Sequence, residues 1–399
     1  MVKVGVIGLG YWGPKLARNF HELPDAMLEW GCDLDQSRLD HVRSLYPEAR
    51  TTRNYRDVLA SDTDAVCIAT PVRTHYQLAM DALRAGKHVL VEKPLAACAL
   101  QAEEIIAEGD RQSRIVMVGH TFVYNPAVLA MKEIIASGRL GEIYYINATR
   151  VNLGLFQPDI NVAWDLAPHD ISILLFILGM RPVHVSARGA SYVQPEKGLH
   201  DVAYLSLYFP NGVLADIRVS WLDPCKIRRY TVVGSQKMLV YDDVDQDHRL
   251  LIYDKGVELP PHSDTAAEFH LSYRNGEAVP YPLDWVEPLK LECQCFLDCV
   301  KSGAPPCSCG RSGLEVIKVL EAAQCSLLNG GTKEVIGGHT GFCAHRTRRE
   351  TGPRCQDLCL RQPVWVSHRR RKQDRRFRRG SKGRPDRSPR ESLEPQLHL

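Results

Sequence analysis

The first residues whose types and spacing could do chemistry are three glycines near the N-terminus. Gly8, Gly10 and Gly13 form a G-x-G-x-x-G motif directly after an apolar run at residues 2–7. In this motif the first glycine permits a tight turn, the second lets a pyrophosphate approach the backbone, and the third allows close helix–strand packing. The free N–H groups at the start of the following helix then face the phosphates. The motif therefore predicts a dinucleotide site.

Asp33 stands twenty residues beyond Gly13, at the end of the next apolar run. An acidic side chain at this place binds the adenosine ribose hydroxyls and would repel the 2′-phosphate of NADP. We therefore expect NAD as the cofactor, although Arg38 lies near enough in sequence to leave NADP open. The alternative is that Asp33 only caps a turn.

Two further motifs follow apolar runs that we interpret as strands. Thr70-Pro71 comes before His75, and Glu92-Lys93-Pro94 ends the run at residues 88–91. Ligands of open α/β sheets bind at the carboxyl ends of the strands. Lys93 could there stabilise a developing alkoxide beside the cofactor, whereas an ordinary loop lysine would only be solvated. The predicted cofactor site comprises Gly8, Gly10, Tyr11, Trp12, Gly13, Asp33, Thr70, Pro71, His75, Glu92 and Lys93.

Asp165 and His169 are four residues apart, so a helix would place them on one face. Histidine is the natural general base near neutral pH, and a carboxylate one turn away could orient it or raise its pKa. The alternative is that Asp165 caps the helix and His169 makes a structural contact. The cofactor motif favours the catalytic interpretation.

The elements that must position these residues alternate over the first 120 residues. Short apolar runs rich in β-branched residues are followed by stretches with helical spacing. Such alternation predicts a parallel sheet with crossover helices on both faces. We expect strands at 2–7, 27–32, 65–69, 88–91 and 115–118, and helices at 14–23, 36–46, 75–85 and 99–111.

The pattern changes after Phe122. Strands then follow one another, and Pro210-Asn211-Gly212 is a hairpin signal between two of them. The fold class is therefore α/β, with an N-terminal Rossmann parallel sheet and a C-terminal α/β domain that has a largely antiparallel open sheet. We expect domains at residues 1–122 and 123–338. Strands are expected at 143–151, 183–188, 203–209, 213–220, 229–233 and 238–242, and helices at 126–137, 164–178, 289–302 and 312–328.

Charge is unevenly distributed along the chain. Residues 339–399 hold 17 Lys and Arg against 6 Asp and Glu, which leaves 33 against 41 in the remainder. We expect this last stretch to be a basic, disordered tail that binds no nucleic acid, because it offers little to bury. Nucleic-acid binding is the weaker alternative.

The remaining composition is that of a cytoplasmic globular protein. No apolar stretch is long enough to span a membrane, and the chain begins directly with a strand, so we expect neither a membrane contact nor a signal peptide. Thirteen cysteines then suggest reduced thiols. The spacing of Cys293, Cys295, Cys299, Cys307 and Cys309 is not that of a zinc module, so we expect no metal.

Together these motifs resemble those of the Gfo/Idh/MocA oxidoreductase family. The resemblance runs to about residue 336 and rests on the glycine loop, Ala69-Thr70-Pro71, Glu92-Lys93-Pro94 and Asp165-x-x-x-His169. It implies that Lys93, Asp165 and His169 form the catalytic centre beside the nicotinamide, with His169 as the base and Asp165 holding it. Usual substrates are sugars, cyclitols or sugar derivatives.

Residues 122–127 and 164–172 resemble the branch that acts on the 3-hydroxyl of UDP-N-acetylglucosamine or its uronate. Many family members have Asp where this chain has Ser172, with Asp170 nearby instead. We expect Tyr124, Asn125 and Arg150 to contact the substrate. The alternatives are a dehydrogenase of free sugars or cyclitols and a non-catalytic NAD-binding sensor. Because its helices can cover only one face of the second sheet, we also expect a homo-oligomer.

Overall fold

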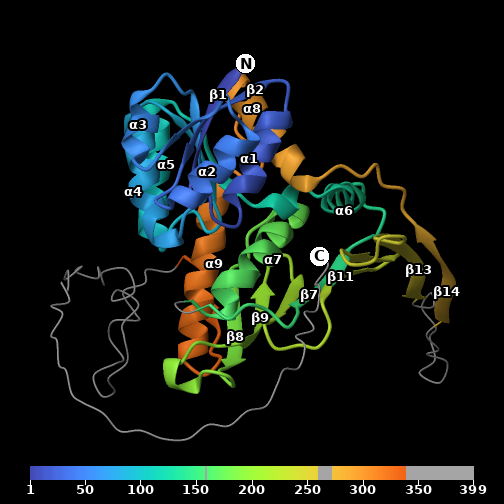
Figure 1. Cartoon of the computed structure of the whole chain (residues 1–399). Coiled ribbons are helices and arrows are strands. Elements are labelled where there is room, and N and C mark those ends of the chain that lie inside the picture. The colour runs from blue at the N-terminus through green and yellow to red at the C-terminus, as the bar shows by residue number, and fades with distance from the viewer. Residues whose placement is uncertain (158–159, 259–271, 338–399) are drawn as a thin grey trace, which may run out of the picture. The chain divides into compact units, whose positions relative to one another are not determined.

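The first sheet of the computed structural model has six parallel strands in the order β3-β2-β1-β4-β5-β6 (Figure 1). The structure describes residues 1–157, 160–258 and 272–337. This order is that of a Rossmann sheet. After β3 the chain crosses back to add β4 on the other side of β1, and this change in strand order leaves a ligand crevice beside β1. The strands are β1 (Val2–Ile7), β2 (Ala26–Cys32), β3 (Arg50–Thr52), β4 (Ala65–Ile68), β5 (His88–Glu92) and β6 (Val116–Gly119).

Helices connect these strands, as the alternation of the sequence predicts. The first buries Leu16, Ala17 and Phe20 on one face, which is why this stretch forms a helix against the sheet. Asp35 and Asn54 accept N-cap hydrogen bonds that fix the starts of the next two helices. The helices are α1 (Gly13–Glu22), α2 (Gln36–Leu45), α3 (Tyr55–Ala60), α4 (His75–Arg84) and α5 (Ala99–Gln112).

The second sheet has nine strands among the described residues, in the order β14-β13-β12-β11-β7-β10-β9-β8-β15. All neighbours are antiparallel except β7 and β10. The fold class expected from the sequence is thus confirmed. The strands are β7 (Ile143–Val151), β8 (His184–Ala190), β9 (Val202–Tyr208), β10 (Leu214–Ser220), β11 (Ile227–Gly234), β12 (Met238–Asp242), β13 (Leu250–Glu258), β14 (Ser272–Pro280) and β15 (Glu334–Val335).

The expected hairpin forms between β9 and β10. Phe209 N–H donates to the carbonyl of Val213 at 3.0 Å, and Gly212 supplies the positive φ of 85° that the turn requires. The two strands pair from Tyr208 with Leu214 onward. The turn therefore sets the register of this part of the sheet.

Helices α6 (Pro126–Ala136), α7 (Val162–Leu178) and α9 (Gly310–Leu328) pack their apolar residues on the second sheet. Helix α8 (Pro288–Ser302) behaves differently, because it returns to the first sheet and packs on α1. There Phe296 meets Phe20 edge-on, with ring centroids 6.5 Å apart. The core of the first sheet thus includes side chains from nearly three hundred residues away in sequence.

The structure also contains elements that the sequence patterns did not predict. Strands β3 and β14 carry few apolar residues, and helix α3 has only 6 residues, so none of the three gives a clear periodicity. No helix among the described residues is long and apolar enough to cross a membrane. The expected basic tail at 339–399 lies outside the described residues.

Candidate active site

The glycine loop between β1 and α1 is shaped for a diphosphate. Gly8 has φ +94°, and a Cβ there would lie 2.6 Å from the carbonyl oxygen of Ala69. A Cβ on Gly13 would lie 1.9 Å from the carbonyl oxygen of Gly8. By contrast, a Cβ on Gly10 would meet only the Arg38 guanidinium, at 3.6 Å, so space remains beside the loop. Helix α1 starts without a side-chain cap, which leaves its first N–H groups available. The loop therefore fits the cofactor phosphates.

Asp33 follows β2 and closes this loop. Its carboxylate accepts hydrogen bonds from Leu9 N–H at 2.6 Å and Asp35 N–H at 2.9 Å, and Arg38 approaches it at 3.4 Å. The carboxylate is thus fixed at the place where a ribose would lie. Beside the loop, the ammonium group of Lys15 lies 4.0 Å and 4.4 Å from the ring centroids of the predicted cofactor residues Tyr11 and Trp12.

His75 joins the two strand-end motifs that follow β4 and β5. One ring nitrogen lies 2.9 Å from the carbonyl oxygen of Pro94 and the other 2.8 Å from that of Thr70. The side chain is buried, and burial lowers its pKa. The structure thus assigns His75 a role in holding Thr70-Pro71 against the segment that carries Lys93.

Glu92 is the buried neighbour of Lys93. Burial raises the pKa of its carboxyl to about 7, although the Lys93 charge acts in the opposite direction. Its carboxylate accepts a hydrogen bond from Lys93 N–H, at 3.3 Å. Glu92 therefore lies behind the loop, and its side chain is not an exposed ligand group.

Lys93 meets helix α7 directly. Its Nζ donates to the carbonyl oxygen of Asp165 at 2.7 Å and lies 3.5 Å from Asp165 Oδ1. The indole N–H of Trp221, a residue that the sequence did not single out, donates to Asp165 Oδ2 at 3.0 Å. The expectation that Asp165 orients His169 is not met by any hydrogen bond of the described residues. Instead, Asp165 positions Lys93.

His169 lies one turn further along α7, against Phe122. The ring centroids are 5.0 Å apart in an edge-on arrangement. Burial lowers the pKa of His169 well below 6.5, and the nearby charges of Lys93 and Arg150 act in the same direction. Its Nδ1 is buried and has no hydrogen-bond partner among the described residues. The imidazole is therefore neutral near pH 7 and able to accept a proton.

Arg150, which the sequence predicts to contact the substrate, is buried and paired with Asp170. It is 5% exposed, its Nε lies 2.9 Å and 3.1 Å from the two carboxylate oxygens of Asp170, and Tyr230 donates to the same carboxylate. Its guanidinium lies 4.3 Å from the ring centroid of Phe122. This buried ion pair ties α7 to the second sheet and supports the ring on which His169 packs.

Tyr124 and Asn125 are also buried, contrary to their predicted contact with substrate. The Tyr124 hydroxyl lies 2.9 Å from the hydroxyl of Ser308, and burial raises its pKa. The Asn125 side chain caps α6 by accepting a hydrogen bond from Ala127 N–H at 2.9 Å. In this structure both side chains are held by contacts within the protein at the start of α6.

Arg228 is the partly exposed cation that the sequence analysis missed. It stands opposite Arg150 on β11 and donates to Asp243 at 3.2 Å, and its charge contributes to the low pKa of His169. The sequence feature that could have revealed Arg228 is the basic run Lys226-Ile227-Arg228-Arg229, at the start of a strand. Only the pairing of β11 with β7 places it near His169.

Two family profiles match this chain. That of the Gfo/Idh/MocA oxidoreductases, described as an NAD-binding Rossmann fold, covers residues 2–120, and that of the Gfo/Idh/MocA C-terminal domain covers residues 128–240. A putative oxidoreductase from Magnetospirillum magnetotacticum is 30% identical, with a TM-score of 0.68, and the match covers 80% of this chain and 99% of that one. The chain belongs to the Gfo/Idh/MocA oxidoreductase family.

Other relatives in this family are sugar and cyclitol dehydrogenases. UDP-N-acetylglucosamine 3-dehydrogenase from Acidithiobacillus ferrooxidans is 28% identical over 65% of this chain and 79% of that protein. Its solved structure has a TM-score of 0.68, with 25% identity over 82% of this chain and 97% of that one. Myo-inositol 2-dehydrogenase from Thermotoga maritima is 25% identical over 82% of this chain and 96% of that protein. The chain is thus an oxidoreductase whose relatives act on sugar or cyclitol hydroxyl groups.

The cysteine-rich segment forms no metal centre in the described part of the chain, where no group of three or more His, Cys, Asp or Glu side chains could hold an ion. Cys295 and Cys299 lie one turn apart on α8 with their sulfur atoms 4.0 Å apart. These thiols pack between α8 and its neighbours.

Proposed function

We propose that the protein oxidises a ring hydroxyl, at C3, of a nucleotide sugar such as UDP-N-acetylglucosamine or its uronate, with NAD⁺ as the acceptor. The observation that carries this proposal is the contact between Lys93, which follows β5, and the Asp165–His169 turn of α7. There the amine, from the end of a strand of the first sheet, lies near enough to the neutral imidazole of α7 for its charge to lower the histidine pKa. A sensor that only binds NAD has no need for a proton acceptor at this place.

Each residue of the site has a separate role in the proposed reaction. Neutral His169 accepts the proton of the substrate hydroxyl, and the Lys93 ammonium stabilises the alkoxide as it develops. Asp165 and Trp221 hold Lys93 in position through the hydrogen bonds described above. Bound NAD⁺ supplies the acceptor for the hydride, and the glycine loop and Asp33 would hold it. The fixed Asp33 carboxylate favours NAD over NADP, because it would lie against a 2′-phosphate.

One observation supports a nucleotide sugar over a free cyclitol. Arg228 gives this site a partly exposed guanidinium, which a diphosphate or a carboxylate would bind and a neutral inositol would not need. The similarity to UDP-N-acetylglucosamine 3-dehydrogenase extends over most of both chains, as does the similarity to myo-inositol 2-dehydrogenase. The inositol dehydrogenases among the relatives make cyclitol oxidation the second candidate.

The test is an absorbance assay of NAD⁺ reduction with a panel of UDP-N-acetylglucosamine, its uronate, myo-inositol and glucose. We expect turnover with a nucleotide sugar, and loss of this turnover in His169→Ala. If myo-inositol or glucose is oxidised far more efficiently than either nucleotide sugar, the substrate class is wrong. Identification of the 3-keto product by NMR would check the position of oxidation.

A further inference from the structure

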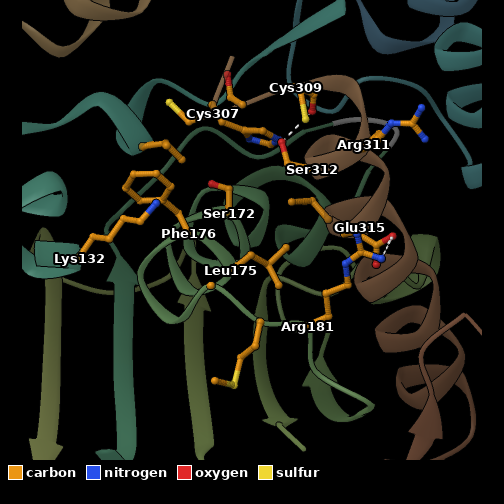
Figure 2. A pocket seen from close by; sticks show the side chains of 16 residues that line it. Lys132, Ser172, Leu175, Phe176, Arg181, Cys307, Cys309, Arg311, Ser312 and Glu315 are labelled. Atoms are coloured by element: carbon orange, nitrogen blue, oxygen red, sulfur yellow. Dashed lines mark hydrogen bonds and ion pairs between the residues drawn. The ribbon is translucent and has the colours of Figure 1, made fainter. Parts of the chain in front are cut away.

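A second site is suggested by a pocket of about 480 Å³ that contains none of the proposed catalytic residues. Figure 2 shows the side chains that line it. They come from the segment after β6 (His120), from α6 (Lys132), from α7 (Ser172 and Phe176) and from the start of α9 (Ser312). A volume of this size is typical of small-molecule sites.

His120 is the buried polar group on the wall of this pocket. It is 2% exposed, and neither ring nitrogen has a hydrogen-bond partner among the described residues. Burial lowers its pKa to about 3, so the ring is neutral, with one donor and one acceptor. Because buried polar groups are nearly always hydrogen-bonded, this imidazole indicates a ligand that would satisfy it.

The charge of the pocket is set by Lys132. Its ammonium group lies 3.9 Å from the ring centroid of Phe176, and no described carboxylate lies within ion-pair distance of it. Arg181 and Arg311, the other cations of the lining, are paired with Glu315 at 3.2 Å and Asp110 at 2.7 Å. Lys132 thus attracts an anion.

The start of α9 adds to this attraction, and one thiol opposes it. The first N–H groups of this helix have no intrahelical acceptors, and Cys309 provides no side-chain cap. Hydrogen bonding with Cys295, with a smaller contribution from Lys132, lowers the pKa of the Cys307 thiol to about 6. A bound anion would therefore compete with the Cys307 thiolate for Lys132.

The hydroxyl groups of the pocket define what else the ligand must carry. Ser172 donates its proton to the carbonyl oxygen of His169 at 2.8 Å, and Ser312 donates to that of Cys309 at 2.7 Å. Both oxygens therefore present lone pairs to the pocket, and a ligand must bring hydroxyl donors to them. A molecule with several hydroxyl groups and one anionic group meets these demands.

We propose that this pocket binds a small anionic sugar, with a sugar phosphate as the best match. Its anionic group would lie between Lys132 and the start of α9, and its hydroxyls would bond Ser172, Ser312 and His120. This site lies apart from the proposed oxidation, because none of Lys93, Asp165 and His169 lines the pocket, although Ser172 bonds the main-chain carbonyl oxygen of His169.

The test is calorimetric titration of the full chain, saturated with NADH so that the dinucleotide site is filled. The probes are glucose 6-phosphate, inorganic phosphate and glucose. We expect one molecule of glucose 6-phosphate per chain, weaker binding of inorganic phosphate and no binding of glucose. Lys132→Met should weaken glucose 6-phosphate binding at least tenfold. Lys333→Met is the matched control, since this ammonium also lies over a ring, that of Tyr208 at 4.0 Å, but outside the pocket.

Three outcomes would overturn the proposal. They are the absence of binding at millimolar glucose 6-phosphate, equal affinity in the wild type and Lys132→Met, and inorganic phosphate binding as tightly as the sugar phosphate.

Discussion

The ammonium group of Lys93 lies 2.7 Å from the main-chain carbonyl oxygen of Asp165, a residue 72 positions later in the chain. This hydrogen bond joins the end of β5 in the first sheet to the first turn of α7, which packs on the second. The next turn of α7 carries the proposed base, His169. A movement between these two elements would therefore separate the amine from the imidazole.

Replacing either member of the pair should abolish most of the turnover. We expect Lys93→Met and His169→Ala each to lower kcat by about 10²-fold or more, as is typical for loss of electrostatic or acid–base assistance. Binding of NADH, followed by its fluorescence, should persist in both, because neither residue contacts the glycine loop. Near-normal turnover in either variant would exclude the assigned role.

The low pKa of His169 has a consequence for the pH profile. Since burial favours the neutral imidazole, the base is already active at pH 6.5, and the loss of kcat/KM on acidification should begin below that value. The measurement is kcat/KM against pH with a verified substrate. An acid limb centred at or above pH 6.5 would contradict a buried, neutral His169.

Glu92 predicts a pH dependence of stability. Whereas kcat/KM should fall at low pH, the stability of the fold should fall as the pH rises. Its pKa is raised to about 7, so the folded state keeps a proton that the unfolded chain releases above about 4.5. Its protonated form thus supports folding fully at low pH, and this contribution is lost as pH rises through 7. Glu92→Gln removes the free-energy cost of ionising this buried carboxyl, so it should raise Tm relative to wild type more at pH 8 than at pH 5. Each kcal/mol of that cost corresponds to roughly 2–4 °C in Tm. The exposed Glu133→Gln should show no such difference.

Asp33 determines the expected cofactor preference. Asp33→Ala should weaken NADH binding, because the hydrogen bonds to Leu9 and Asp35 that shape the loop are lost together with the ribose ligand. It should weaken NADPH binding less, since Arg38 is then released toward a phosphate. Calorimetry on the wild type that gives tighter binding of NADPH than of NADH would overturn the preference.

The outer face of the second sheet predicts self-association. Tyr145 on β7 and Tyr204 on β9 are 41% and 52% exposed on the side opposite the core residues Ile146 and Leu205. We expect light scattering to give a homo-oligomer at micromolar concentration, and Tyr204→Glu to shift it toward smaller species. A wild-type monomer under these conditions would refute the prediction.

The sequence predicts the parts of the fold that local patterns govern. Apolar runs and helical spacing predict every strand of the first sheet except β3, and Pro210-Asn211-Gly212 predicts the β9–β10 turn. Strand β14 is mostly exposed and polar, so no alternation reveals it. The cofactor loop is also predictable, because its glycines are required by backbone contacts that any dinucleotide loop of this kind makes.

The sequence predicts which residues form the candidate site better than it predicts which residues they hydrogen-bond. Lys93, Asp165 and His169 come together, but Asp165 bonds Lys93 and Trp221, a choice that depends on how α7 packs. Arg150 and Arg228 are both basic strand residues, and only the sheet decides that the first is buried against Asp170 while the second remains partly exposed. Burial of this kind depends on tertiary contacts that no short segment encodes.

Phe296 of α8 packs on Phe20 of α1, and this contact has a consequence for biosynthesis. A ribosome releases the first sheet long before it reaches residue 296, so in the nascent Rossmann segment the part of α1 that α8 later covers, around Phe20, is still exposed. During that interval it is a client for chaperones and a target for proteases. Maturation of the cofactor domain is thereby coupled to translation of almost the whole second domain.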